Sequence, residues 1–131
     1  LGFLKTREGL GTQLAERASN LSGGQCQRLA IARALLADAL VYIFDEAASN
    51  IDVESEELIM EVIRELARTK TVILISHRLA NVVEADCIYL VSEGQICERG
   101  THSELMRENG AYRRLYESQM ELESYRKEDA S

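Results

Sequence analysis

Two short stretches decide the fold: Leu21-Ser22-Gly23-Gly24-Gln25, and further along Val41-Tyr42-Ile43-Phe44-Asp45-Glu46. In the first, Ser22 is a helix N-cap, and Gln25 three residues later completes a capping box. A helix is therefore predicted from this point to about Leu36. The second is a continuous apolar run of strand length that ends in two carboxylates. Such a run is typical of a parallel strand covered on both faces.

The next elements continue the alternation of helices and strands. Asp52 is the predicted N-cap of a second helix, and Thr71–Ile75 is a β-branched strand. A strand, a helix and a strand in this order predict a right-handed crossover with parallel strands. The fold class is therefore α/β. Further elements are expected as follows: a short helix over residues 79–85, a hairpin of strands 87–91 and 95–98, a helix capped by Thr101 and Glu104, and a last helix from about Ala111.

Composition limits the possible functions. The chain has 131 residues, 46% of them hydrophobic, which suits one domain with a packed core. Its net charge of -7 disfavours sequence-independent nucleic-acid binding. It contains no apolar run of transmembrane length. The first residue is Leu rather than Met, which fits a segment of a longer protein. The three cysteines are expected to be reduced thiols, since their spacing with the two histidines matches no zinc pattern.

Ser22, Gly23 and Gly24 form a candidate anion site. First-turn N–H groups and the helix dipole both favour negative charge, and glycines let an oxygen-rich anion approach the backbone. Ser22 adds a hydroxyl donor. Taken alone, the same residues also fit an ordinary helix cap.

Asp45 and Glu46 are candidate catalytic carboxylates at the end of the apolar strand, the edge where ligands bind in open α/β folds. Hard oxygen ligands suit Mg²⁺, so Asp45 would hold the metal, and Glu46 would orient or deprotonate the attacking water. The alternative is two solvated acids. His77 follows the next strand, where a donor could stabilise charge on a phosphate, although a lone histidine is more often a packing residue. His102 is expected to be a surface residue.

These motifs, in this order, resemble the ATP-binding cassette (ABC) ATPase family. The resemblance implies that residues 21–25 are the signature sequence, which contacts the γ-phosphate of ATP held by a partner domain. Asp45 and Glu46 then resemble the Walker B aspartate and catalytic glutamate, and His77 resembles the histidine of the switch loop. The resemblance also places Ser49 and Asp52 in the loop that lines the dimer seam. The nucleotide-binding residues acting in trans are Leu21, Ser22, Gly23, Gly24 and Gln25.

One family motif is absent. No lysine follows any glycine, so the Gly-x-x-x-x-Gly-Lys-Ser/Thr phosphate loop is missing. The chain therefore resembles the C-terminal half of a nucleotide-binding domain: a partial P-loop NTPase fold whose parallel sheet lacks the phosphate-loop strand. Residues 1–38 would belong to the helical signature part, 39–110 to the core and 111–131 to the C-terminal helix and tail. Alone, this piece is predicted to hydrolyse no ATP and to associate through its open sheet edge.

Two segments resemble exporters within the family: Thr12–Arg17, and Glu46-Ala47-Ala48 with no following proline. The resemblance implies ATP hydrolysis with Mg²⁺ at a dimer interface, coupled to solute transport. The implied partners are a second nucleotide-binding domain and a transmembrane domain, at the cytoplasmic face of the membrane, with no nucleic acid. Two alternatives remain open from the residues: a DNA-maintenance ATPase with the same core, which the acidic charge disfavours, and a non-catalytic regulatory piece.

Overall fold

The computed structural model describes residues 9–13, 15–16, 19–48 and 51–129. The chain divides into two compact units, Leu1–Ile75 and Ser76–Ser131. The division falls directly after the second strand.

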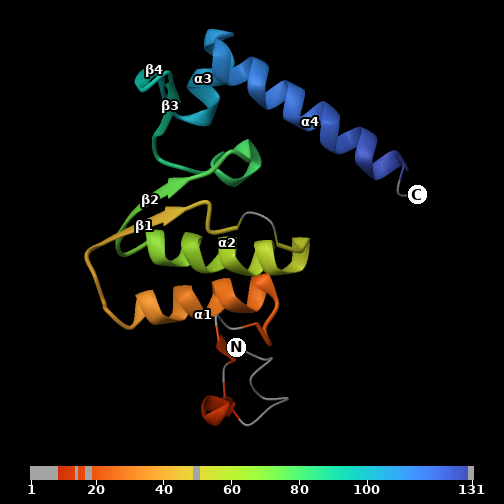
Figure 1. Ribbon diagram of the computed structural model, residues 1–131. Helices are drawn as coiled ribbons and strands as arrows, with labels where there is room; N and C mark the ends of the chain where they lie inside the picture. The colour runs from red at the N-terminus through yellow and green to blue at the C-terminus, as the bar shows by residue number, and fades with distance from the viewer. Residues whose placement is uncertain (1–8, 14, 17–18, 49–50, 130–131) are drawn as a thin grey trace. The chain divides into compact units, whose positions relative to one another are not determined.

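The first unit is a parallel strand pair covered by two helices. After a 3₁₀ turn, η2 (Gly9–Gly11), it contains α1 (Gly23–Leu35), β1 (Val41–Asp45), α2 (Val53–Ala67) and β2 (Thr71–Ile75). The strands pair in parallel, from Val41 opposite Thr71 to Asp45 opposite Ile75, as the crossover pattern predicts. Figure 1 shows α2 beside the strands and α1 beside α2, with both helices running opposite to the strands.

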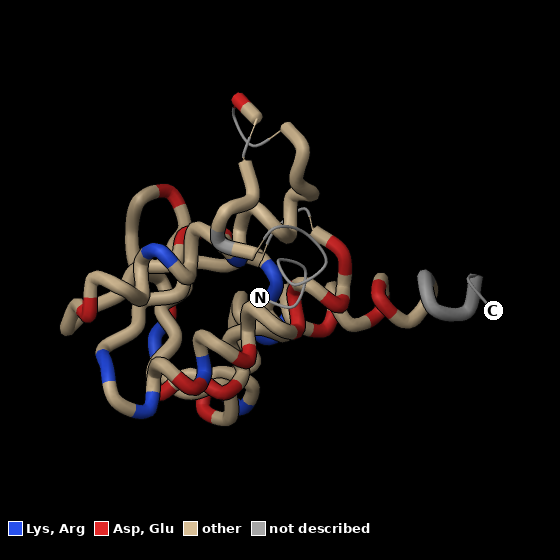
Figure 2. The backbone as a smooth tube through the Cα atoms, turned by 90° about the horizontal axis from the view of Figure 1, so that it is seen from below, with Lys and Arg blue, Asp and Glu red and all other residues tan. Residues whose placement is uncertain are grey.

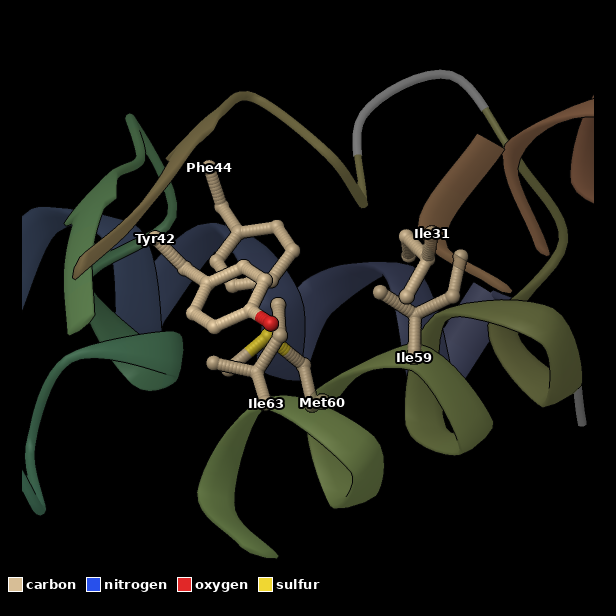
Figure 3. Close-up of a cluster of buried hydrophobic side chains, with 6 residues drawn as sticks. All are labelled: Ile31, Tyr42, Phe44, Ile59, Met60 and Ile63. Carbon is tan, nitrogen blue, oxygen red and sulfur yellow. The ribbon is translucent and has the colours of Figure 1, made fainter. Parts of the chain in front are cut away.

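Buried and exposed side chains alternate along β1, and the buried ones form part of the core of this unit. Tyr42 and Phe44 point toward α2, and their rings stack with centroids 6.3 Å apart. The buried side chains come from both helices and from β1 (Figure 3): they are Ile31, Tyr42, Phe44, Ile59, Met60 and Ile63. Burial of these side chains fixes which face of the strand pair the helices cover, because apolar area removed from water is the main favourable term.

The opposite face of the strand pair is open. Val41, Ile43, Ile73 and Ile75 are 47–66% exposed. The expectation that both faces of the Asp45 strand are covered is therefore wrong for the described residues. This face is exposed because α1 and α2 both lie on the other side of the strand pair. Within the described part of the chain, β1 and β2 pair only with each other, so the sheet edges are open as well.

The second unit joins a hairpin to two helices. It contains η4 (Leu79–Asn81), β3 (Ile88–Ser92), β4 (Gln95–Gly100), α3 (His102–Glu108) and α4 (Ala111–Asp129). The hairpin turn is Glu93-Gly94, and both residues have positive φ, as a tight two-residue turn requires. The core consists of Leu79, Ile88, Leu105 and Tyr112.

Two expectations about this unit are wrong. The helix predicted over residues 79–85 is a single 3₁₀ turn, because Arg78 provides no side-chain cap and Val82 and Val83 are β-branched. His102 is half-buried: its Nδ1 lies 2.9 Å from the hydroxyl of Tyr112, and its ring contacts Tyr116 edge-on. The sequence pattern around a helix start did not reveal this contact because the tyrosines lie on the next helix.

Charged residues and cysteines are spread over the described chain. Figure 2 shows Lys and Arg positions dispersed among Asp and Glu positions along the described chain, rather than gathered in one segment. Among the described residues, Cys26, Cys87 and Cys97 form no disulfide. Among the described helices, none combines the length and apolar character that crossing a membrane would need.

Candidate functional site

The predicted anion site and the predicted carboxylates lie in the same unit, at the same end of the strand pair. In Figure 1, the carboxyl ends of β1 and β2 and the N-terminal ends of α1 and α2 face the same side. Helix N-termini carry partial positive charge, and the carboxyl edge of a parallel sheet is where ligands bind in open α/β folds. The fold therefore places donors for an anion and carboxylates for a cation at one edge.

Ser22 begins α1 with the predicted capping box. Its hydroxyl accepts a hydrogen bond from the Gln25 N–H at 3.2 Å, and the Gln25 side-chain oxygen accepts one from the Ser22 N–H at 3.0 Å. Ser22 and Gly23 are exposed, whereas Leu21 and Gln25 are half-buried. The helix start is thus structurally defined, and its first exposed residues are the serine and the first glycine.

The two glycines have different surroundings. A Cβ atom at Gly24 would lie 2.5 Å from Ser55 Oγ and 2.8 Å from Ser55 Cβ, closer than real contacts allow. At Gly23 the nearest atom would be Ile51 Cγ2, at an ordinary 3.9 Å. Gly24 is therefore required for close packing of α1 against the start of α2. Gly23 is the glycine whose missing side chain leaves the exposed backbone open to a ligand.

Arg28 and Ser55 join the two helix starts, and the sequence analysis did not identify them. Arg28 Nη1 donates to Ser55 Oγ at 3.1 Å, and the Ser55 N–H donates to Asp52 Oδ2 at 2.9 Å. The Ser55 N–H first, and the Arg28 charge to a smaller extent, hold the pKa of Asp52 below its ordinary value. The sequence places Arg28 only one helical turn after Gln25, which indicates that its side chain lies near the start of α1. Its partner is distant along the chain.

Asp45 and Glu46 leave β1 in different directions. Asp45 is the last residue of the strand, on the exposed face opposite Tyr42 and Phe44. Glu46 has a φ of 49°, and its N–H donates to Ile75 O at 2.9 Å. A left-handed backbone at a residue other than glycine costs free energy and is frequent at functional sites. The backbone turns at Glu46, so this side chain does not continue the alternation of the strand.

Of the three remaining predicted site residues, the structure describes Asp52 and His77. Ser49 falls outside the described residues, so its predicted place in the dimer seam stays a prediction. Asp52 is described, as the exposed N-cap of α2. His77 belongs to the second unit, two residues after β2, and is exposed. Its carbonyl oxygen accepts a hydrogen bond from Gln119 Nε2 at 2.6 Å.

The donor set at this edge suits Mg²⁺ bound together with a nucleotide. Carboxylate oxygen is the ligand type that Mg²⁺ prefers, and the ion commonly takes only one or two protein ligands beside water and phosphate oxygens. The described residues include no group of three or more potential metal-binding side chains. Asp45 is thus chemically suited to the metal, and the remaining ligands would come from nucleotide and water.

A pocket of about 340 Å³ lies in the second unit. Its lining includes Asp86, Cys87, Arg99 and Glu104, and none of the predicted site residues. The arrangement that fits the predicted chemistry is therefore the strand edge of the first unit. An α/β unit with an exposed helix start and an acidic strand end at one edge fits a nucleotide-binding protein, the class that the sequence resemblance implies.

Comparison with known proteins agrees with this class. The sequence profile of the ABC transporter family matches residues 3–49. An uncharacterized ABC transporter ATP-binding protein of Haemophilus influenzae is 55% identical over 95% of this chain, and an ATP-dependent lipid A-core flippase of Mannheimia succiniciproducens is 51% identical over 85%. A solved bacterial Atm1-family ABC exporter with ATP bound superposes with a TM-score of 0.81 at 35% identity, over 90% of this chain.

The chain therefore belongs to the ABC transporter family and is part of an exporter-type ATP-binding domain. It spans only 22% and 19% of the lengths of these two relatives, and 21% of the exporter chain. The predicted fold class, a partial ABC ATPase fold with a parallel-sheet core, is confirmed. The relatives favour the exporter interpretation over a DNA-maintenance ATPase.

Proposed function

We propose that this chain is the signature-bearing part of the ATPase in an exporter-type ABC transporter. The intact subunit hydrolyses ATP at an interface between two nucleotide-binding domains and couples hydrolysis to transport through a transmembrane domain, from the cytoplasmic face of the membrane. The observation that supports this most is the shared edge of the first unit, where the exposed Ser22-Gly23 helix start and the Asp45-Glu46 strand end lie together.

Each residue has a role in this proposal. Asp45 holds Mg²⁺, and Glu46 accepts a proton from the attacking water or orients it. Ser22, Gly23 and the first turn of α1, flanked by Leu21 and Gln25, contact the γ-phosphate of ATP bound to the partner domain. His77 donates to the γ-phosphate as charge develops. Ser49 and Asp52 line the seam between the domains.

The similarity to lipid A-core flippases concerns the ATP-binding segment alone. Our proposal therefore identifies the ATPase and not the solute. A phosphate-binding loop with a lysine must be supplied by another part of the intact subunit, since the chain described here has none.

The test is ATP hydrolysis by the intact subunit with Glu46→Gln. This substitution keeps size and removes the base, so we expect kcat to fall about 10²- to 10⁴-fold while ATP is still bound. Glu57→Gln, an exposed change on α2, is the matched control and should leave kcat unchanged. Normal turnover by the Glu46→Gln protein would overturn the assignment.

A second experiment tests the phosphate contact at Gly23. Gly23→Asp places a carboxylate at the exposed helix start, where it repels phosphate. In the Glu46→Gln background, ATP should drive association of the ATP-binding domains, and adding Gly23→Asp should abolish that association. Undiminished ATP-dependent association with Gly23→Asp would contradict a phosphate contact at this helix start.

A further inference from the structure

The last helix contacts the turn that carries His77 through one side-chain amide. Gln119 Nε2 donates to the His77 carbonyl at 2.6 Å, and Gln119 Oε1 accepts from the Leu79 N–H at 2.9 Å. The two partners, an acceptor and a donor, fix the orientation of the amide. A single residue of α4 thus holds the backbone on both sides of Arg78.

A second contact comes from the next turn of the same helix. Glu123 Oε1 lies 3.2 Å from Arg78 Nη2, and both side chains are partly exposed. Gln119 and Glu123 are four residues apart, so they lie on one face of α4. Three consecutive residues, His77 to Leu79, are therefore each bound by this face.

The turn is also fixed from inside the unit. Leu79 is buried and belongs to the core with Ile88, Leu105 and Tyr112. Ser76 Oγ accepts from the Arg78 N–H at 3.0 Å. The backbone around His77 is thus held at several points, while the His77 side chain is exposed. This arrangement sets the position from which the imidazole extends.

We propose that Gln119 and Glu123 are positioning residues of the ATPase, which set the place of His77 from the C-terminal helix. The inference rests on the proposed function, because that function gives His77 its contact with the γ-phosphate. Neither residue touches the nucleotide in this scheme. Both act through the backbone of the His77 turn.

Loss of these contacts is expected to change the kinetics of ATP hydrolysis. If His77 stabilises charge that develops in the transition state, displacing it lowers kcat more than it raises the KM for ATP. A misplacement of about 1 Å in a catalytic group can cost about 10²-fold in rate. We expect Gln119→Ala to lower kcat about 10- to 100-fold and to change KM less than threefold. Glu123→Gln, which removes only the ion pair, should have a smaller effect in the same direction.

The test is a double-mutant cycle in the intact subunit: Gln119→Ala, His77→Ala and both together. A residue that acts through His77 has nothing left to position once the imidazole is gone, so the double variant should match His77→Ala. Ser118→Ala and Glu121→Gln, exposed neighbours on α4, are the matched controls and should retain wild-type kcat. Unchanged kcat in Gln119→Ala, or an equal loss in the presence and absence of His77, overturns the proposal.

Hydrogen exchange separates this proposal from the proposed function. Gln119→Ala should speed exchange at the Leu79 amide, a readout that requires no ATPase activity. Gln119→Glu keeps the size and the acceptor for Leu79, so it serves if the alanine variant does not fold. It should leave the Leu79 amide protected and still lower kcat, because it loses the donor to His77. Unaltered Leu79 exchange in Gln119→Ala refutes the positioning contact, whereas absent wild-type turnover refutes the proposed function.

Discussion

Replacing each glycine of the pair by alanine should separate packing from ligand binding. A Cβ at position 24 would lie 2.5 and 2.8 Å from two atoms of Ser55, and one of them is Ser55 Cβ, which cannot move without its backbone. Overpacking of this kind costs about 1–3 kcal/mol. Alanine regains up to about 1 kcal/mol of helix propensity. We therefore expect Gly24→Ala to lower the free energy of unfolding by about 1–2 kcal/mol.

Gly23→Ala is the matched control for stability. Its Cβ would meet nothing closer than 3.9 Å, so the variant should be as stable as the wild type or slightly more stable. The measurement is urea or thermal unfolding of the intact ATP-binding domain that contains this segment. The reasoning is refuted if Gly24→Ala is as stable as the wild type, or if both variants lose stability equally.

The same pair also gives a functional contrast. Under the proposed function, Gly23→Ala adds a methyl group where the phosphate approaches, so ATP-dependent activity should fall without loss of stability. Gly24→Ala should lose stability first. A Gly23→Ala domain with normal activity would show that the exposed helix start is an ordinary cap.

Three further outcomes are expected. The Ser55 N–H holds the pKa of Asp52 in the folded protein below its ordinary value of 3.8. Ionised Asp52 therefore stabilises the fold at pH values above its pKa in the unfolded chain, and this contribution is lost as the pH falls through its pKa in the folded protein. Asp52→Asn keeps a cap and should flatten the stability profile between about pH 5 and pH 3 in urea titrations; an unchanged slope contradicts this. Glu98 accepts hydrogen bonds from the Ala111 and Tyr112 N–H groups, so Glu98→Ala should lower thermal stability by about 1–2 kcal/mol, and wild-type stability would argue against this cap. The isolated 131-residue chain should show no Mg-ATPase turnover and should self-associate in sedimentation, since its strand pair has an open apolar face; turnover or a stable monomer would count against these expectations.

Local sequence was sufficient wherever the determining contacts are near in the chain. The capping boxes at Ser22 and Thr101, the Asp52 cap and the Glu93-Gly94 turn each depend on residues within three or four positions. The order of strand, helix and strand was sufficient for the parallel pairing of β1 and β2, because the helix returns the chain to the edge where β1 began, so β2 runs in the same direction. The family resemblance placed the candidate site residues without any knowledge of their surroundings.

The sequence by itself determined the class of fold and the family, and it predicted which residues bind phosphate and metal. Tertiary structure decided which glycine is needed for packing, and it joined Arg28 to Ser55 and Gln119 to the His77 turn. These contacts bridge helices that are distant along the chain, so no local periodicity encodes them. Tertiary structure also decided which face of the strand pair is covered, because an apolar run records hydrophobicity and not the direction from which helices approach.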